Sequence, residues 1–198
     1  MQRIVLAIAL SLFAVSTVAN DWDDLMRGNR RYVDGHLVYS HLASQRRANA
    51  GQQNPPVTVI SCADSRVPPE LMFDQTVGDL FVVRVAGNVM DDFNLASVEY
   101  AVANKWTKMI VVVGHESCGA VKEAVSSQTD FGSPALNALV KKIRENLGGR
   151  KPPLREAIDM NARATAAQLR ESKIIRDSNV EIVTTYYSFD GKVTKIGN

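Results

Sequence analysis

The sequence predicts an α/β fold in which a mostly parallel β-sheet is flanked by helices. Short apolar runs rich in β-branched residues alternate along the chain with longer segments whose apolar residues recur at helical spacing. The clearest run, residues 109–113 (MIVVV), is continuously apolar, which is typical of a strand covered on both faces. Near the end of the chain, two strand-like runs flank Asp190-Gly191, and this pattern predicts an antiparallel β-hairpin at one sheet edge.

Residues 20–198 are expected to form a single domain that begins with a helical arm at residues 20–51. Pro55-Pro56 interrupts the chain directly before the first expected strand, at residues 57–60. The later elements alternate as an α/β domain requires. The expected strands are residues 57–60, 80–85, 109–113, 180–189 and 193–196, and the expected helices beyond the arm are residues 95–104, 119–126, 135–147 and 154–169.

The first nineteen residues have the pattern of a cleavable signal peptide. A cationic start ending at Arg3 precedes a mainly apolar run from Ile4 to Val15, and small residues lead up to Ala19. A membrane anchor or a buried N-terminal helix are the alternatives, but the run is shorter than the roughly 20 residues that span a bilayer. We expect export to a periplasm or to the medium, cleavage after Ala19, and no membrane attachment afterwards.

The charge distribution argues against nucleic acid as a partner. The chain has 23 Lys and Arg residues against 21 Asp and Glu residues, a formal net charge of +2. No basic tract stands out along the sequence, and a nucleic-acid-binding domain usually concentrates its positive charge on one face.

Two polar clusters follow directly after expected strands. The first is SCADSR at residues 61–66, and the second is GHESCG at residues 114–119. In open parallel sheets the functional crevice lies beyond the carboxyl ends of the strands. These clusters contain both cysteines of the chain and one of its three histidines.

Cys62, His115 and Cys118 therefore predict a zinc site. Thiolate and imidazole are ligands that zinc prefers, and three protein ligands leave the fourth position open, as in catalytic sites. His115 and Cys118 are three residues apart, so one turn entering a helix can direct both at one ion. In an exported protein, a Cys62–Cys118 disulfide is the competing interpretation.

Asp64 and Arg66 are predicted to act beside this metal. Alternation along an extended segment puts Cys62, Asp64 and Arg66 on one side of the chain. Asp64 is then either a fourth ligand that closes the site or a carboxylate held by Arg66 that accepts a hydrogen bond from zinc-bound water. An ordinary surface ion pair is the plainer alternative. His36 and His41 are expected to be surface or packing residues.

Several of these segments together resemble the β-class carbonic anhydrases. The resemblance extends over nearly all of the chain after residue 19. Its matching segments are residues 28–35 (GNRRYVDG), 62–70 (CADSRVPPE), 73–88 (FDQTVGDLFVVRVAGN), 95–102 (LASVEYAV), 111–125 (VVVGHESCGAVKEAV) and 184–193 (TTYYSFDGKV).

The resemblance implies one Zn²⁺ per chain on the three predicted ligands. It implies that Asp64 and Arg66 form a catalytic dyad and that the side-chain amide of Gln75 helps to place the substrate. It also implies a homodimer or homotetramer in which the N-terminal helical arm wraps a partner subunit.

The activity that the resemblance implies is zinc-dependent, reversible hydration of carbon dioxide to bicarbonate and a proton by zinc-bound hydroxide. Two alternatives stay open. One is an exported, non-enzymatic domain with a Cys62–Cys118 disulfide, which leaves the two polar clusters unexplained. The other is a related zinc enzyme that acts on carbonyl sulfide or carbon disulfide, since the same chemistry suits a linear substrate.

Overall fold

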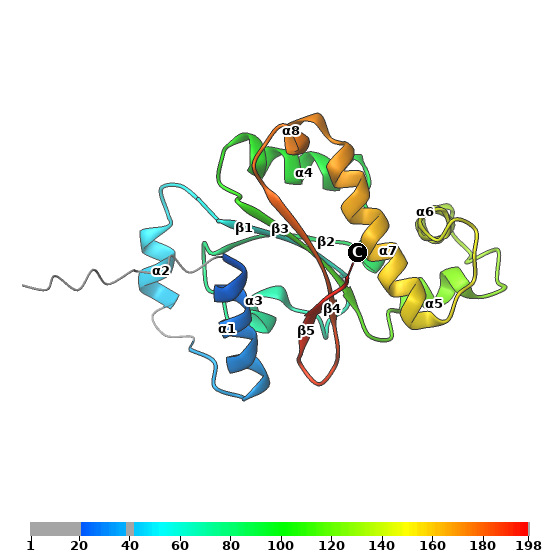
Figure 1. Cartoon of the computed structure of the whole chain (residues 1–198), viewed down its shortest axis with the longest axis horizontal. Coiled ribbons are helices and arrows are strands. Elements are labelled where there is room, and N and C mark those ends of the chain that lie inside the picture. The colour runs from blue at the N-terminus through cyan, green and yellow to red at the C-terminus, as the bar shows by residue number, and fades with distance from the viewer. Residues whose placement is uncertain (1–20, 39–41, 198) are drawn as a thin grey trace, which may run out of the picture.

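The computed structural model describes residues 21–38 and 42–197. Its centre is one five-stranded sheet with the strand order β2-β1-β3-β4-β5 (Figure 1). The first four strands of this order are parallel to one another, and β5 is antiparallel to β4. The strands are β1 (Val57–Ser61), β2 (Leu80–Arg84), β3 (Met109–His115), β4 (Glu181–Tyr187) and β5 (Val193–Lys195).

The sheet is covered on both faces, as the apolar character of its central strands predicts. Every residue of β1 and β3 is buried. Successive side chains point to opposite faces, so Ile60 and Val112 belong to one apolar cluster and Val59 and Val111 to the other. The site described below lies where these two central strands end.

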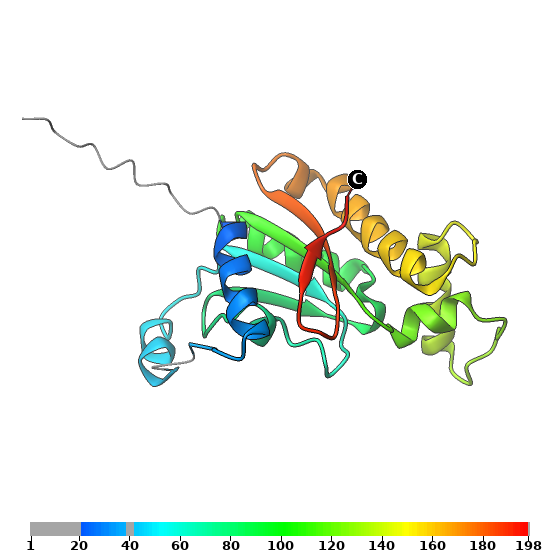
Figure 2. The same cartoon turned by 60° about the horizontal axis from the view of Figure 1, so that its bottom comes forward.

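Helices α4 to α8 pack on one face of the sheet, while α1 lies across the other face with α3 (Figure 2). The short helix α2 has no buried residue and stands to one side of the sheet (Figure 1). The helices are α1 (Asp21–Val33), α2 (Leu42–Ala48), α3 (Pro69–Met72), α4 (Asp92–Ala103), α5 (Gly119–Val125), α6 (Pro134–Asn146), α7 (Leu154–Glu171) and α8 (Lys173–Arg176), and a 3₁₀ turn, η1, spans Ala86–Asn88.

The predicted fold class, the five predicted strands and the C-terminal hairpin are confirmed. Helix α4 begins three residues before the expected start, because the side chain of Asp91 caps it by accepting a hydrogen bond from the Asn94 N–H at 2.8 Å. The one-turn helices α3 and α8 were not expected from the sequence. The expected signal peptide lies outside the described residues, so its cleavage stays a prediction.

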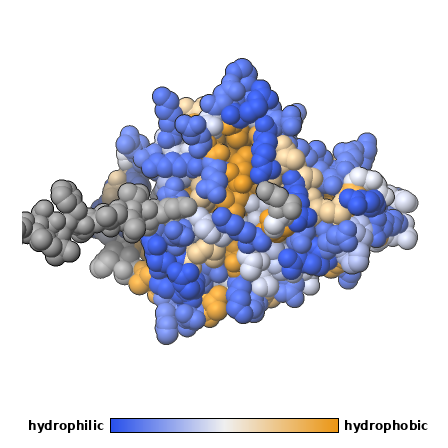
Figure 3. Space-filling model, in the orientation of Figure 1, coloured by the Kyte–Doolittle hydropathy of each residue, from blue (hydrophilic) through white to orange (hydrophobic). Residues whose placement is uncertain are grey.

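The described surface is mainly hydrophilic, with an apolar strip along the middle of the face shown in Figure 3. No helix in the described part of the chain combines the length and the apolar character needed to cross a membrane.

A glycine allows α1 to dock on the segment after α3. A Cβ atom added to Gly28 would lie 1.7 Å from the backbone oxygen of Phe73. We expect Gly28→Ala to lower the free energy of unfolding by about 3 kcal/mol, because the helix must move away from its contact. Urea unfolding measures this, with Gly51→Ala as the control since nothing lies within 4 Å of its added Cβ. Equal stability of the two variants would contradict the docking of α1.

Candidate metal centre

The carboxyl ends of β1 and β3 bring the predicted ligand residues together. The two strands are parallel neighbours, with Ile60 paired to Val112, so Cys62 directly after β1 lies at the same sheet edge as His115 at the end of β3. Cys118 follows as the N-cap residue of α5. The potential ligand atoms of Cys62, His115 and Cys118 lie within 4.8 Å of one another, and all three residues are buried.

His115 has one ring nitrogen anchored to the backbone and the other unpartnered. Its Nδ1 lies 2.8 Å from the carbonyl oxygen of Glu116, which can only accept, so Nδ1 carries the proton. Nε2 is buried without a hydrogen-bond partner. A carbonyl that orients the ring in this way is a usual outer-shell partner of a metal-ligating histidine. A metal that accepts the lone pair of Nε2 accounts for this otherwise costly burial.

The two thiols are free and interact with each other. The hydrogen bond from Cys118 is the main reason that the pKa of Cys62 is lowered to about 4. The side chain of His115 and the backbone N–H groups of Gly87, at 3.3 Å, and Asp64, at 3.4 Å, lower it further against the effect of burial. The pKa of Cys118 is raised, first because its thiol interacts with Cys62 and then by burial. A dication bound between the sulfurs would replace the shared proton and stabilise both thiolates.

The donor set fits zinc. Two thiolates and one imidazole are a known catalytic zinc set that leaves one position open. Within the described residues, this is the one group of three or more Cys, His, Asp and Glu side chains with metal-binding spacing. The three residues predicted as ligands are thus the three that the fold brings together.

Asp64 is held by Arg66 and is not a member of this ligand group. The Nε and Nη2 atoms of Arg66 donate to Oδ1 at 2.9 Å and Oδ2 at 2.7 Å, and its backbone N–H donates to Oδ1 at 2.9 Å. These bonds, those of the guanidinium first, hold the pKa of Asp64 well below its usual range. The backbone N–H of Asp64 lies 3.4 Å from the Sγ of Cys62, so an ionised, oriented carboxylate lies next to the ligand group.

The turn between β4 and β5 packs on this ion pair. The Phe189 ring centroid lies 4.2 Å from the guanidinium carbon of Arg66 and 6.1 Å from the centroid of the His115 ring. The backbone N–H of Phe189 donates to the Glu116 carboxylate at 2.8 Å. The C-terminal hairpin therefore adds an apolar surface to the site and limits the positions that Arg66 can take.

Gln75 is not brought to the ligand group within one chain. It lines a hollow together with Val57, which begins β1, whereas Cys62 follows the other end of that strand. Its role in placing a substrate stays a prediction. His36 is exposed and is not part of the ligand group, in agreement with its predicted surface position. His41 lies outside the described residues.

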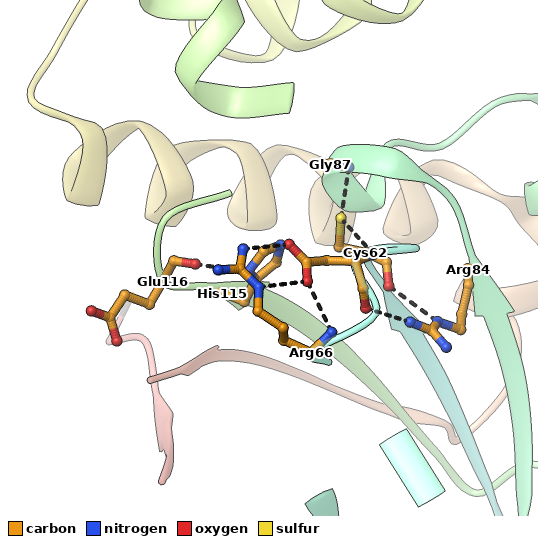
Figure 4. Close-up of polar contacts among 7 residues, drawn as sticks. Cys62, Arg66, Arg84, Gly87, His115 and Glu116 are labelled. Carbon is orange, nitrogen blue, oxygen red and sulfur yellow. Dashed lines mark hydrogen bonds and ion pairs between the residues drawn. The ribbon is translucent and has the colours of Figure 1, made fainter. Parts of the chain in front are cut away.

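Arg84 supports the site in a way that the sequence analysis missed. Its Nε donates to the Cys62 carbonyl at 3.1 Å and its Nη2 to the Asp64 carbonyl at 2.7 Å (Figure 4). A single charge at the end of the otherwise apolar segment 80–84 (LFVVR) was the available signal. The two bonds fix the backbone that carries the first cysteine and the carboxylate.

Comparison with known sequences agrees with this geometry. A family model described as carbonic anhydrase matches residues 57–193. The carbonic anhydrase of Mycolicibacterium smegmatis is 38% identical over 185 residues, which cover 87% of this chain and 90% of that protein. Carbonic anhydrase 2 of Mycobacterium tuberculosis is 46% identical over 114 residues, or 57% of this chain and 55% of that protein.

Solved structures of β-carbonic anhydrases share this fold. A tetrameric β-carbonic anhydrase of Sordaria macrospora superposes with a TM-score of 0.67 at 26% identity, covering 79% of this chain and 91% of that one. The β-carbonic anhydrase of Coccomyxa, at 24% identity, shares the fold with a TM-score of 0.71 over 90% of this chain and 87% of that one. The match of the family model, the similarity over most of the sequence and the shared fold together identify this chain as a member of the β-class carbonic anhydrases.

Proposed function

We propose that this chain catalyses the reversible hydration of carbon dioxide to bicarbonate and a proton, with one Zn²⁺ per chain held by Cys62, His115 and Cys118. The observation that carries the proposal is the cluster of these three buried side chains, whose ligand atoms lie within 4.8 Å of one another. When bound, zinc supplies a Lewis acid that lowers the pKa of a coordinated water from about 15.7 toward 7.

The residues around the ligands orient the reactants. The carbonyl of Glu116 keeps the Nδ1 proton of His115 in place, so that Nε2 remains free to bind. Asp64 stays ionised beside Arg66. Since each carboxylate oxygen has two lone pairs, Asp64 can still accept a hydrogen bond from the attacking oxygen nucleophile and aim it at carbon dioxide. The ring of Phe189 provides an apolar neighbour for that substrate.

Asp64 as a fourth ligand is the competing role. In that role the metal would compete for oxygens that already accept three hydrogen bonds from Arg66, two at Oδ1 and one at Oδ2. Charge-assisted, bidentate pairs are among the stronger hydrogen bonds in proteins. The arrangement therefore favours the role of hydrogen-bond acceptor.

We also propose that the mature protein begins at Asn20 after export and assembles as a homodimer or homotetramer. Strand β2 is a sheet edge with half-buried apolar residues, and α2 buries none of its side chains. The Sordaria macrospora relative is tetrameric. Native mass spectrometry is expected to give two or four copies of a chain that lacks residues 1–19. A monomer would contradict the proposed assembly, and an exported chain that keeps residues 1–19 would contradict the proposed cleavage.

Stopped-flow carbon dioxide hydration by the mature protein, with zinc counted on the same sample, tests the activity. We expect about one zinc per chain and fast hydration, and slower turnover of carbonyl sulfide. Fast turnover of carbonyl sulfide without carbon dioxide hydration would instead assign the substrate to the sulfur analogue. Titration of the denatured, metal-free protein is expected to find two free thiols. No zinc and no free thiols would favour the Cys62–Cys118 disulfide.

A further inference from the structure

A chain of side-chain amides, half-buried at Gln168 and Asn146 and fully buried at Asn161, runs from helices α6 and α7 to the turn η1. Gln168 Nε2 donates to Asn146 Oδ1 at 2.9 Å, and Asn146 Nδ2 donates to Asn161 Oδ1 at 2.8 Å. Asn161, which is fully buried, then donates through Nδ2 to the carbonyl of Gly87 at 2.7 Å. All three amides are therefore oriented in the same direction, toward η1.

A second side chain of α7 holds the next carbonyl of that turn. Thr165, also fully buried, donates through Oγ1 to the carbonyl of Asn88 at 3.0 Å. It is four residues after Asn161, so both side chains lie on one face of α7. Gly87 and Asn88 have φ angles of 67° and 44°, and a positive φ is unfavourable for a residue other than glycine. The contacts from α7 thus hold a backbone conformation that Asn88 adopts at a cost.

The same turn donates to the predicted metal ligand. The N–H of Gly87 lies 3.3 Å from the Sγ of Cys62, and Figure 4 shows that sulfur directed at Gly87. A Cβ atom on Gly87 would lie 2.8 Å from Ile143, so the turn has little space to shift. The two carbonyl contacts from α7 therefore act on the same turn that carries the Gly87 N–H.

The amide of Asn161 and the hydroxyl of Thr165 are not needed to pack α7 against the core. Around them, α7 contributes Ile158, Ala162 and Ala166 to the apolar core, and buried amides cost free energy unless each is satisfied. We propose that Asn161 and Thr165 are positioning residues for the metal centre. They hold η1 so that the Gly87 N–H donates a hydrogen bond that stabilises the Cys62 thiolate. They thereby slow the release of the metal. This inference rests on the proposed zinc site.

The test compares two isosteric substitutions in the full mature protein. Thr165→Val removes the hydroxyl donor to η1 without changing side-chain shape. Thr58→Val is the matched control, because Thr58 is equally buried but bonds to Thr107 at 2.6 Å, near the start of β1. Zinc transfer to a chromogenic chelator is expected to be about 10-fold faster for Thr165→Val than for wild type. For Thr58→Val the rate should stay near that of wild type, even where its Tm falls by as much.

Asn161→Leu and cobalt substitution give independent readouts. Asn161→Leu is expected to release zinc at least as fast as Thr165→Val, and in both variants the thiolate-to-cobalt charge-transfer band should shift. If release and band match those of Thr58→Val at a similar Tm, the role is structural and the inference is overturned. A wild-type protein that binds no zinc would overturn the proposed function, whereas normal zinc release from both α7 variants would overturn this inference alone.

Discussion

Cys118→Ser is expected to abolish zinc binding and carbon dioxide hydration together. Cys118 is 1% exposed and lies beside Cys62 and His115. A serine hydroxyl does not ionise near neutral pH and is not among the usual zinc ligands, so only two ligands would remain. Since changes to outer-shell partners alone cost about 10–100-fold in metal affinity or activity, we expect a loss of activity of at least about 100-fold.

Metal analysis and hydration rates on the same samples measure this effect. A matched histidine pair provides the control: His115→Gln should lose zinc like Cys118→Ser, while His36→Gln, at an exposed residue away from the cluster, should keep it. Thermal unfolding checks that each variant is folded. One zinc per chain and full activity in Cys118→Ser would exclude this cysteine as a ligand.

Asp64→Asn is expected to leave zinc in place and to lower kcat by about 10²–10³-fold. The amide cannot supply a charged acceptor for the nucleophile, and its NH₂ group faces the donors of Arg66. Removal of one preorganised group that acts in the transition state has cost about this much in other enzymes. The reduction should be in kcat, measured by stopped-flow hydration at equal zinc content.

The chain contains a closely matched control for this ion pair. In α7, Arg155 Nε lies 3.0 Å from Asp159 Oδ1, and the side-chain exposures of that pair, 56% and 18%, are close to the 54% and 16% of Arg66 and Asp64. Asp159→Asn should therefore keep wild-type kcat. Equal effects of the two substitutions would assign Asp64 a structural role, and loss of zinc from Asp64→Asn would support it as a ligand.

Much of the fold could be predicted because its signals are local. The runs at 57–60 and 109–113 indicated buried strands, and Asp190-Gly191 indicated the hairpin; all three are present. The ligand residues could be predicted for a related reason. Each cluster directly follows a strand, and the carboxyl ends of parallel strands meet at one edge of the sheet.

The supporting contacts could not be predicted because they join distant parts of the chain. Asn161 and Gly87 are 74 residues apart, and Arg84 reaches Cys62 over 22 residues. An asparagine in α7 has no local feature that identifies it as a partner of a turn. The short helix α3 was missed for a different reason: residues 69–72 make one turn, too few to show helical periodicity.

Zinc K-edge X-ray absorption on the mature protein tests the zinc centre most directly. Ligation by Cys62, His115 and Cys118 predicts two sulfur neighbours at about 2.3 Å and an imidazole nitrogen at about 2.0–2.1 Å, with one further light atom. The sulfur signal should fall to one neighbour in any zinc that Cys118→Ser retains. A spectrum with nitrogen and oxygen neighbours only would contradict the assignment of both cysteines and with it the proposed centre.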